Sequence, residues 1–259
     1  MRTPLSLLVA CLLAVALCPG TAHASGYPVK DSPVLTDNAL YETGRLKTTS
    51  CRPAAPKAGS ASSAERYLRS VARCLDATWS AHLRKAGKPF TPPRIRFHSK
   101  PRDYCGRPWP KDMLSDYCLR DSTIVFLLNG STTKVSKQYA FMAMAHEYAH
   151  HVQKLYGIQQ AYAELPHRNT RERYEQTRRY DLQADCLSAA FARSVWKSLD
   201  LPKSAWKDFL LVSIQGGDGY WGTHEYGKGE SIVQWLLTGY DEASPGDCNT
   251  WTAGPSWVA

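Results

Sequence analysis

The chain has 259 residues and a formal net charge of +9, because 32 lysines and arginines outweigh 23 aspartates and glutamates. This length suffices for one large domain or two small ones. The basic residues are scattered and no nucleic-acid motif with interleaved aromatics occurs, so we expect no nucleic-acid partner. A positive charge instead favours contact with anionic surfaces such as cell-surface polymers.

Residues 1–24 have the pattern of a secretory signal peptide. Arg2 supplies an early positive charge, an apolar run extends from Leu5 to Leu17, and Ala22-His23-Ala24 is a small-x-small cleavage box. The run is too short for a membrane-spanning helix, and no later segment is long enough to cross a bilayer. We therefore predict a secreted, extracellular protein that begins after Ala24 and has no stable membrane insertion.

The remaining chain divides by composition into a leading segment and one domain. Residues 25–61 are rich in Pro, Ser, Thr, Ala and Gly, which predicts an extended or loop-rich segment; whether it is a removable pro-segment stays open. From residue 62 to 259 the chain predicts a single α+β domain with a helical C-terminal half. The expected elements are a helix from Ser63 to about Gly87, a strand after Pro93, a loop from Cys105 to Cys118, a strand over 122–129, and helices over 135–156, 171–198, 203–214 and 228–240.

Six cysteines remain after the leader, and an even number in an exported chain indicates disulfides. The expected pairs are Cys51–Cys74, Cys105–Cys118 and Cys186–Cys248, although one pair could instead stay free and buried. No spacing is CxxC, which argues against a cysteine zinc cluster.

The predicted helix over 135–156 contains the motif His146-Glu147-Tyr148-Ala149-His150, an HExxH sequence. Residues four apart share one helix face, so His146 and His150 can direct ring nitrogens at one zinc ion. Glu147 is rotated by about one hundred degrees, which leaves it free to act as a general base. His151 cannot share that face and is expected to be a hydrogen-bonded structural residue.

A catalytic zinc needs a third protein ligand. A metzincin would continue HExxHxxGxxH, but Gln153 and Tyr156 occupy the Gly and last His positions and exclude that class. The helix over 171–198 offers Asp181 and Asp185, which are four apart on one face. We expect Asp181 to bind the metal and Asp185 to accept the N–H of a ligand histidine. The alternative is that both are ordinary surface acids.

The two segments HEYAHHVQ and DLQADCLSAAFA resemble the bacterial neutral zinc metallopeptidase family, whose motifs are HEYGHHVQ and ELQADC. The resemblance extends from about residue 62 onward. It implies a zincin-like fold, a small sheet packed on the active-site helix, and a gluzincin-like site whose third ligand is the first acid of the second motif, here Asp181. Aspartate is one methylene shorter than the glutamate of the family. Thr223-His224 is followed by Glu225-Tyr226-Gly227, where the family has a Gly/Ser-rich turn.

Together these features predict a secreted, zinc-dependent peptidase that acts on peptide or protein substrates with one Zn²⁺ ion. Glu147 is the expected general base, and His224 or Tyr226 could donate to the oxyanion. Two alternatives stay open: a catalytically inactive zinc-binding interaction module on a zincin scaffold, and an amidase acting on cell-wall peptides. A purely structural zinc is disfavoured, because a closed site needs a fourth protein ligand.

Overall fold

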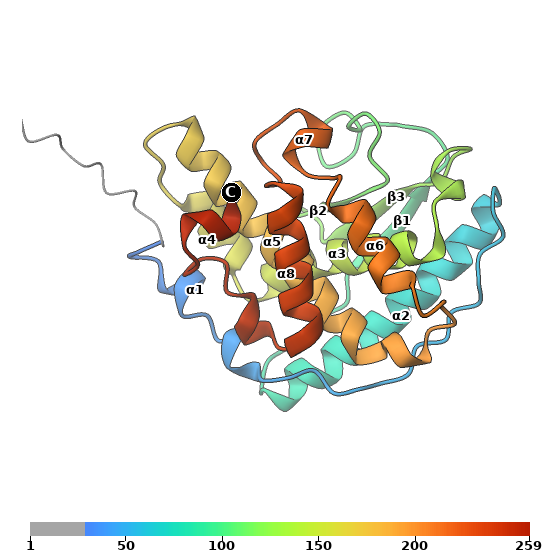
Figure 1. Cartoon of the computed structure of the whole chain (residues 1–259), viewed down its shortest axis with the longest axis horizontal. Coiled ribbons are helices and arrows are strands. Elements are labelled where there is room, and N and C mark those ends of the chain that lie inside the picture. The colour runs from blue at the N-terminus through green and yellow to red at the C-terminus, as the bar shows by residue number, and fades with distance from the viewer. Residues whose placement is uncertain (1–28) are drawn as a thin grey trace, which may run out of the picture.

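The computed structural model describes residues 29–259, so the predicted signal peptide, residues 1–24, lies outside the described part. The fold is α+β: a small sheet and a larger set of helices (Figure 1). The strands are β1 (Arg94–His98), β2 (Ser115–Cys118) and β3 (Thr123–Leu127). The α-helices are α1 (Pro33–Thr36), α2 (Ala61–Lys85), α3 (Lys137–Leu155), α4 (Ile158–Glu164), α5 (Thr170–Val195), α6 (Ala205–Ser213), α7 (Asp218–Trp221) and α8 (Gly229–Glu242).

The sheet has the strand order β1-β3-β2, with β3 parallel to β1 and antiparallel to β2. All residues of β3 are buried, as its continuous apolar sequence predicts. The prediction that residues 105–118 form only a loop is wrong at its end, because β2 pairs Ser115 with Phe126 and Cys118 with Thr123. Four residues are too few to show an alternating pattern, so pairing with β3 decides their conformation.

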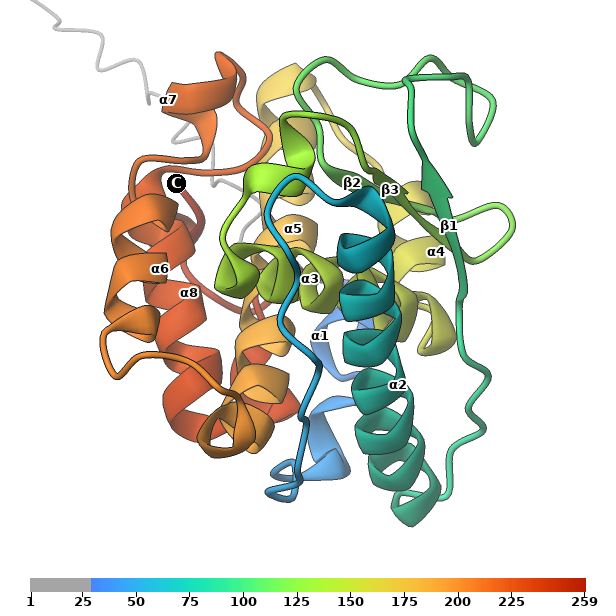
Figure 2. The same ribbon diagram turned by 90° about the vertical axis from the view of Figure 1, so that its right-hand side faces the viewer.

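Helix α3 lies at the centre of the molecule, between α2 and β2 on one side and α5 on the other, with α8 packed beyond α5 (Figure 2). Ser136 begins α3 by accepting a hydrogen bond from the Tyr139 N–H, and Asn169 begins α5 by accepting one from Glu172. Helices α5 and α8 approach closely at Gly239, where an added Cβ would lie 2.0 Å from the Cys186 carbonyl oxygen. Only glycine fits this crossing.

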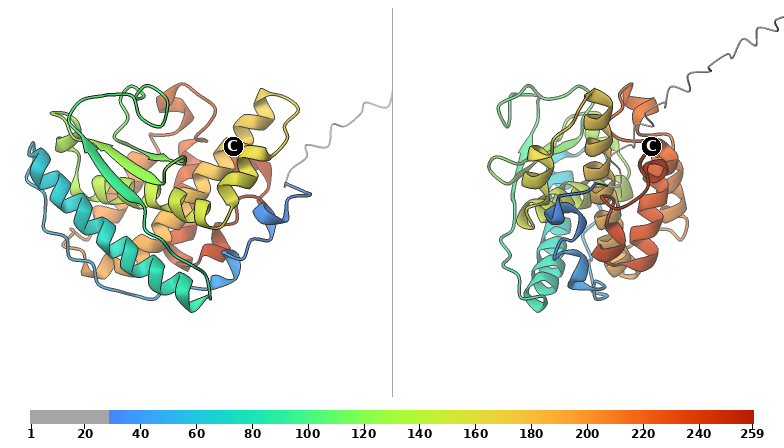
Figure 3. Two further views of the ribbon diagram at one scale, coloured as in Figure 1. Left: turned by 180° about the vertical axis from the view of Figure 1, so that it is seen from behind. Right: turned by 90° about the vertical axis from the view of Figure 1, so that its left-hand side faces the viewer.

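The segment before α2 is packed onto the domain. It contains α1 and a short 3-10 turn at Tyr41–Thr43, and it wraps along the outside of the helices (Figure 3). Its apolar side chains Leu35, Leu40 and Leu46 are buried in the common core. The sequence pattern does not predict α1, α4 or α7, because elements this short leave little periodicity to detect.

The structure contains three disulfides, Cys51–Cys74, Cys105–Cys118 and Cys186–Cys248, which are the three pairs expected from the sequence. The last of them joins α5 to the C-terminal segment across 62 residues of sequence. Within residues 29–259, no helix combines the length and the apolar character that crossing a membrane requires.

Candidate metal centre

The histidines of the HExxH motif lie on the inward side of α3. Glu147 and His150 are buried, with 7% and 8% of their surface exposed, and His146 is half-buried. The helix is apolar around the motif, with Met144, Ala145 and Tyr148 in the core. The polar side chains of the motif therefore face other protein groups instead of bulk water.

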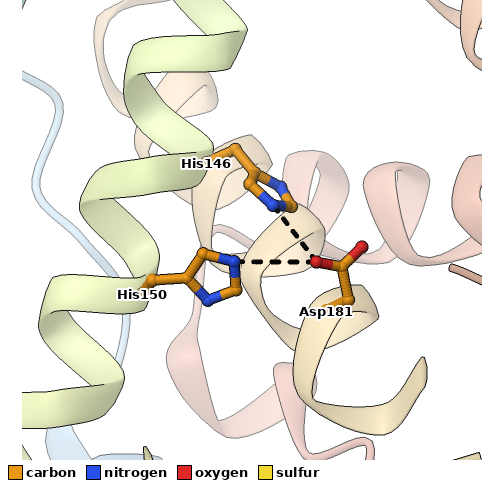
Figure 4. A group of neighbouring side chains, drawn as sticks. All are labelled: His146, His150 and Asp181. Carbon is orange, nitrogen blue, oxygen red and sulfur yellow. Dashed lines mark ion pairs between the residues drawn. The ribbon is translucent and has the colours of Figure 1, made fainter. Parts of the chain in front are cut away.

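Asp181 of α5 joins the two histidines of α3 (Figure 4). Its Oδ1 lies 3.4 Å from Nε2 of His146 and 3.6 Å from Nε2 of His150. In the described part of the chain, these three residues form the one group of His, Cys, Asp or Glu side chains whose potential ligand atoms all lie within 4.8 Å of one another. The structure thus brings together the three residues predicted to bind the metal.

The donor set fits zinc. Tetrahedral zinc with bonds of about 2.0–2.1 Å separates its ligand atoms by roughly 3.3 Å, close to the two distances from Asp181. Nitrogen and carboxylate oxygen are ligand types that zinc accepts, and three protein ligands leave one position for water or substrate. The shorter side chain of Asp181, compared with glutamate, does not keep its carboxylate away from the two imidazoles.

Each histidine is oriented through its other ring nitrogen. His146 Nδ1 donates to Asp185 Oδ1 at 2.8 Å, the contact predicted for Asp185. His150 Nδ1 donates to Oε1 of Gln153 at 2.8 Å. Because Nδ1 is engaged in each ring, Nε2 is the nitrogen left to bind a metal.

Gln153 belongs to a buried amide network that extends to the C-terminal segment. Its Nε2 donates to the Tyr180 carbonyl at 2.8 Å and to Gln183 Oε1 at 2.9 Å. Gln183 in turn donates to the carbonyl of Cys248 at 3.1 Å. The ring of Tyr180 stacks on His150 with 4.7 Å between ring centroids. The position of His150 is therefore fixed by three separate parts of the chain.

The electrostatics of the cluster favour a cation. Burial by itself lowers the pKa of His146, but the carboxylates of Asp185 and Asp181 raise it well above its ordinary value. Burial also works to raise the pKa of Asp181, but the imidazoles of His146 and His150 hold it far below its ordinary value. Positive charge is thus stabilised between these side chains, as a bound dication requires.

Glu147 contacts β2 at a residue that the sequence pattern does not mark. Ser115 Oγ donates to Glu147 Oε1 at 2.9 Å. The neighbouring Asp116 has a pKa raised to about 8 by burial and by the charge of Glu147, and its Oδ2 accepts a hydrogen bond from Arg107. Ser115 and Asp116 lie in the segment interpreted as a loop, and no motif marks them. Gln153 was also missed, although its place one helical turn after His150 was a usable signal.

The structure places the two predicted oxyanion donors differently. His224 is exposed, and its ring faces Tyr174 at 5.8 Å between centroids. Tyr226 is half-buried, and burial together with the charge of Asp181 raises its pKa to about 12, so its hydroxyl keeps its proton at neutral pH. The charge of Asp181 thus acts on the Tyr226 hydroxyl, and the role of Tyr226 as a donor stays a prediction.

Comparison with known proteins shows the family to which the chain belongs. Residues 24–208 match the family model described as "Putative neutral zinc metallopeptidase", and the chain belongs to that family. The proteins named "Uncharacterized protein YpfJ" of Escherichia coli strain K12 and of Escherichia coli O6:H1 are each 26% identical to it over 212 residues, which cover 72% of this chain and 71% of theirs. No solved structure matches the chain.

Proposed function

We propose that the protein is a secreted zinc-dependent peptidase of zincin-like architecture, in which His146, His150 and Asp181 hold the metal. The observation that carries the proposal is the convergence of three ligand atoms within 4.8 Å, beside the buried carboxylate of Glu147. Membership of a zinc metallopeptidase family supports the same reading. The packing of β2 against α3, the helix that bears the motif, supports the zincin-like architecture.

The chemistry divides between the metal and the side chains. When bound, zinc acidifies water and polarises carbonyl groups. Glu147 accepts a proton from the attacking water and returns it to the leaving amine. Asp185 and Gln153 keep the two imidazoles in the ligand tautomer. Tyr226, protonated at neutral pH, is the candidate donor to the oxyanion.

Other features of the chain support the proposed export and the proposed partners. Three disulfides are compatible with an oxidising, extracellular environment. The net charge of +9 favours association with an anionic cell-surface polymer, which would bring the enzyme to substrates held there. Peptides or unfolded proteins are the proposed substrates.

Removal of the metal is expected to abolish activity and to lower stability. We expect the zinc-loaded protein without its leader to cleave casein, a chelator to stop cleavage, and added zinc to restore it. Binding also stabilises the fold by RT ln(1 + [Zn]/Kd), about 2.7 kcal/mol at a hundredfold excess over Kd, which calorimetry measures as a rise in Tm. Asp181→Ala is the matched control, and its Tm should no longer respond to zinc.

The same experiment separates the alternative functions. Stabilisation by zinc without cleavage of casein or of cell-wall peptides would identify an inactive zinc-binding module. Cleavage of cell-wall peptides alone would identify an amidase. A Tm that does not respond to zinc would contradict zinc binding at this site, and with it the proposed function.

The hydrogen bond from His146 to Asp185 gives a separate prediction about metal affinity. Asp185→Asn keeps the size of the side chain but removes the negative charge that orients the ring and increases its basicity. We expect zinc affinity to fall by about 10–100-fold, measured by competition with a chromophoric chelator. Asp241→Asn, a change in an exposed residue of α8, should leave the affinity unchanged.

A further inference from the structure

We propose that Ser115 is a positioning residue that fixes the orientation of Glu147. This inference rests on the proposed function, because it assigns Glu147 the part of general base. Ser115 Oγ donates to Glu147 Oε1 at 2.9 Å, and both residues are buried, with 8% and 7% of their surface exposed. A hydrogen bond to a buried carboxylate is stronger than one between neutral groups and holds a defined geometry.

The hydrogen bond between Ser115 and Glu147 is one of two side-chain contacts that join strand β2 to helix α3. Ser115 and Tyr117 are two apart on β2 and point to the same side of the strand. They meet Glu147 and His151, which are four apart on α3. Two strand residues advance by about 6.8 Å and four helix residues by about 6.0 Å, so the two spacings agree. The strand therefore runs along the helix in register with its motif.

The contact between Tyr117 and His151 holds strand β2 where Ser115 can reach Glu147. His151 Nε2 lies 2.6 Å from the Thr91 carbonyl oxygen and must donate to it. In the neutral ring, Nδ1 is then the acceptor for the Tyr117 hydroxyl at 2.8 Å. One residue further along, Cys118 is held by its disulfide to Cys105. These contacts prevent β2 from sliding along α3, and so they hold Ser115 opposite Glu147.

The consequence concerns the two oxygens of Glu147. Oε1 is engaged by Ser115, so Oε2 is the oxygen left to accept the proton of the attacking water. Without the hydroxyl, the carboxylate can rotate about its last torsion, which is broad for glutamate. The Glu147 carboxylate would then point at the attacking water in a smaller fraction of enzyme–substrate complexes. This lowers kcat and leaves KM unchanged.

The test compares Ser115→Ala with Ser115→Thr, which restores a hydroxyl and suits a strand. We expect Ala to lower kcat about tenfold with KM within twofold of wild type, and Thr to recover most of the loss. In a Glu147→Gln background, Ser115→Ala should cause no further loss, because there is no base left to position. Ser194→Ala, which removes a buried hydroxyl bonded to its own helix, is the matched control and should retain full activity.

A readout independent of activity completes the test. A crystal structure of the wild type should show one orientation of the Glu147 carboxylate, and one of Ser115→Ala should show several. The two proteins should bind zinc with equal affinity. An unchanged kcat in Ser115→Ala, a loss that persists in the Glu147→Gln background, or a carboxylate that keeps its orientation without the hydroxyl would each overturn the inference. If the wild type hydrolyses no peptide, the proposed function fails, and the crystal structures still decide whether Ser115 orients Glu147.

Discussion

Replacing Glu147 by glutamine is expected to lower kcat/KM for casein-derived peptides by about 10²–10⁴-fold, the usual contribution of a general base. The amide has nearly the same shape as the carboxylate, and its oxygen can still accept the hydrogen bond from Ser115. It cannot take up a proton at neutral pH. The loss should therefore appear in kcat, while zinc affinity and Tm stay close to those of the wild type.

The matched control for this prediction is Glu65→Gln, which changes a partly exposed glutamate paired with Arg69 on α2. It should leave kcat/KM unchanged. A Glu147→Gln variant with undiminished activity would falsify the assignment of the base. A variant that lost zinc as well as activity would show that Glu147 supports the metal site itself.

The second large effect is expected from the Cys186–Cys248 disulfide, which closes the longest loop of the three, 62 residues in sequence separation. By the loop-entropy relation, its loss in a Cys186→Ala/Cys248→Ala variant lowers the free energy of unfolding by about 4 kcal/mol. For a domain of this size that corresponds to a fall in Tm of roughly 10 °C. Denaturant unfolding under non-reducing conditions measures the difference.

This disulfide also bears on the metal site. The Cys248 carbonyl accepts the hydrogen bond from Gln183, which accepts in turn from Gln153, the partner of His150. We therefore expect weaker zinc binding as well as lower stability. The Cys105→Ala/Cys118→Ala variant is the comparison: its loop of 13 residues predicts a smaller loss, about 3 kcal/mol. An equal or larger loss there would contradict the loop-entropy explanation.

Several features of this site could be predicted from the sequence because they depend on short spacings along a helix. His146 and His150 share a face since four residues make just over one turn, and Asp181 and Asp185 do so for the same reason. The apolar residues that flank both motifs predict that these faces are buried. Long periodic helices such as α2, α3 and α5 were identified because periodicity is strongest where an element has many residues.

The residues around the three candidate metal ligands could not be predicted from helical spacing in this way. Strand β2 forms only because β3 offers it a partner, and its register against α3 brings Ser115 to Glu147. Likewise, Gln153, the partner of His150, is held by Gln183, which in turn contacts the Cys248 carbonyl. Gln153, Gln183 and Cys248 are far apart along the chain and meet only in the folded core. Such contacts leave no periodic signal, because neither partner indicates the other at a fixed spacing.

The sequence by itself therefore determined the three side chains of the candidate metal site, the helices that carry them and the expected cysteine pairs. The tertiary structure alone decided which groups hold Gln153, the partner of His150, and which oxygen of Glu147 is engaged. The physical reason is the range of the interactions. Helical geometry acts over four residues, whereas the hydrogen bonds Gln153–Gln183, Ser115–Glu147 and Gln183–Cys248 join residues 30, 32 and 65 positions apart.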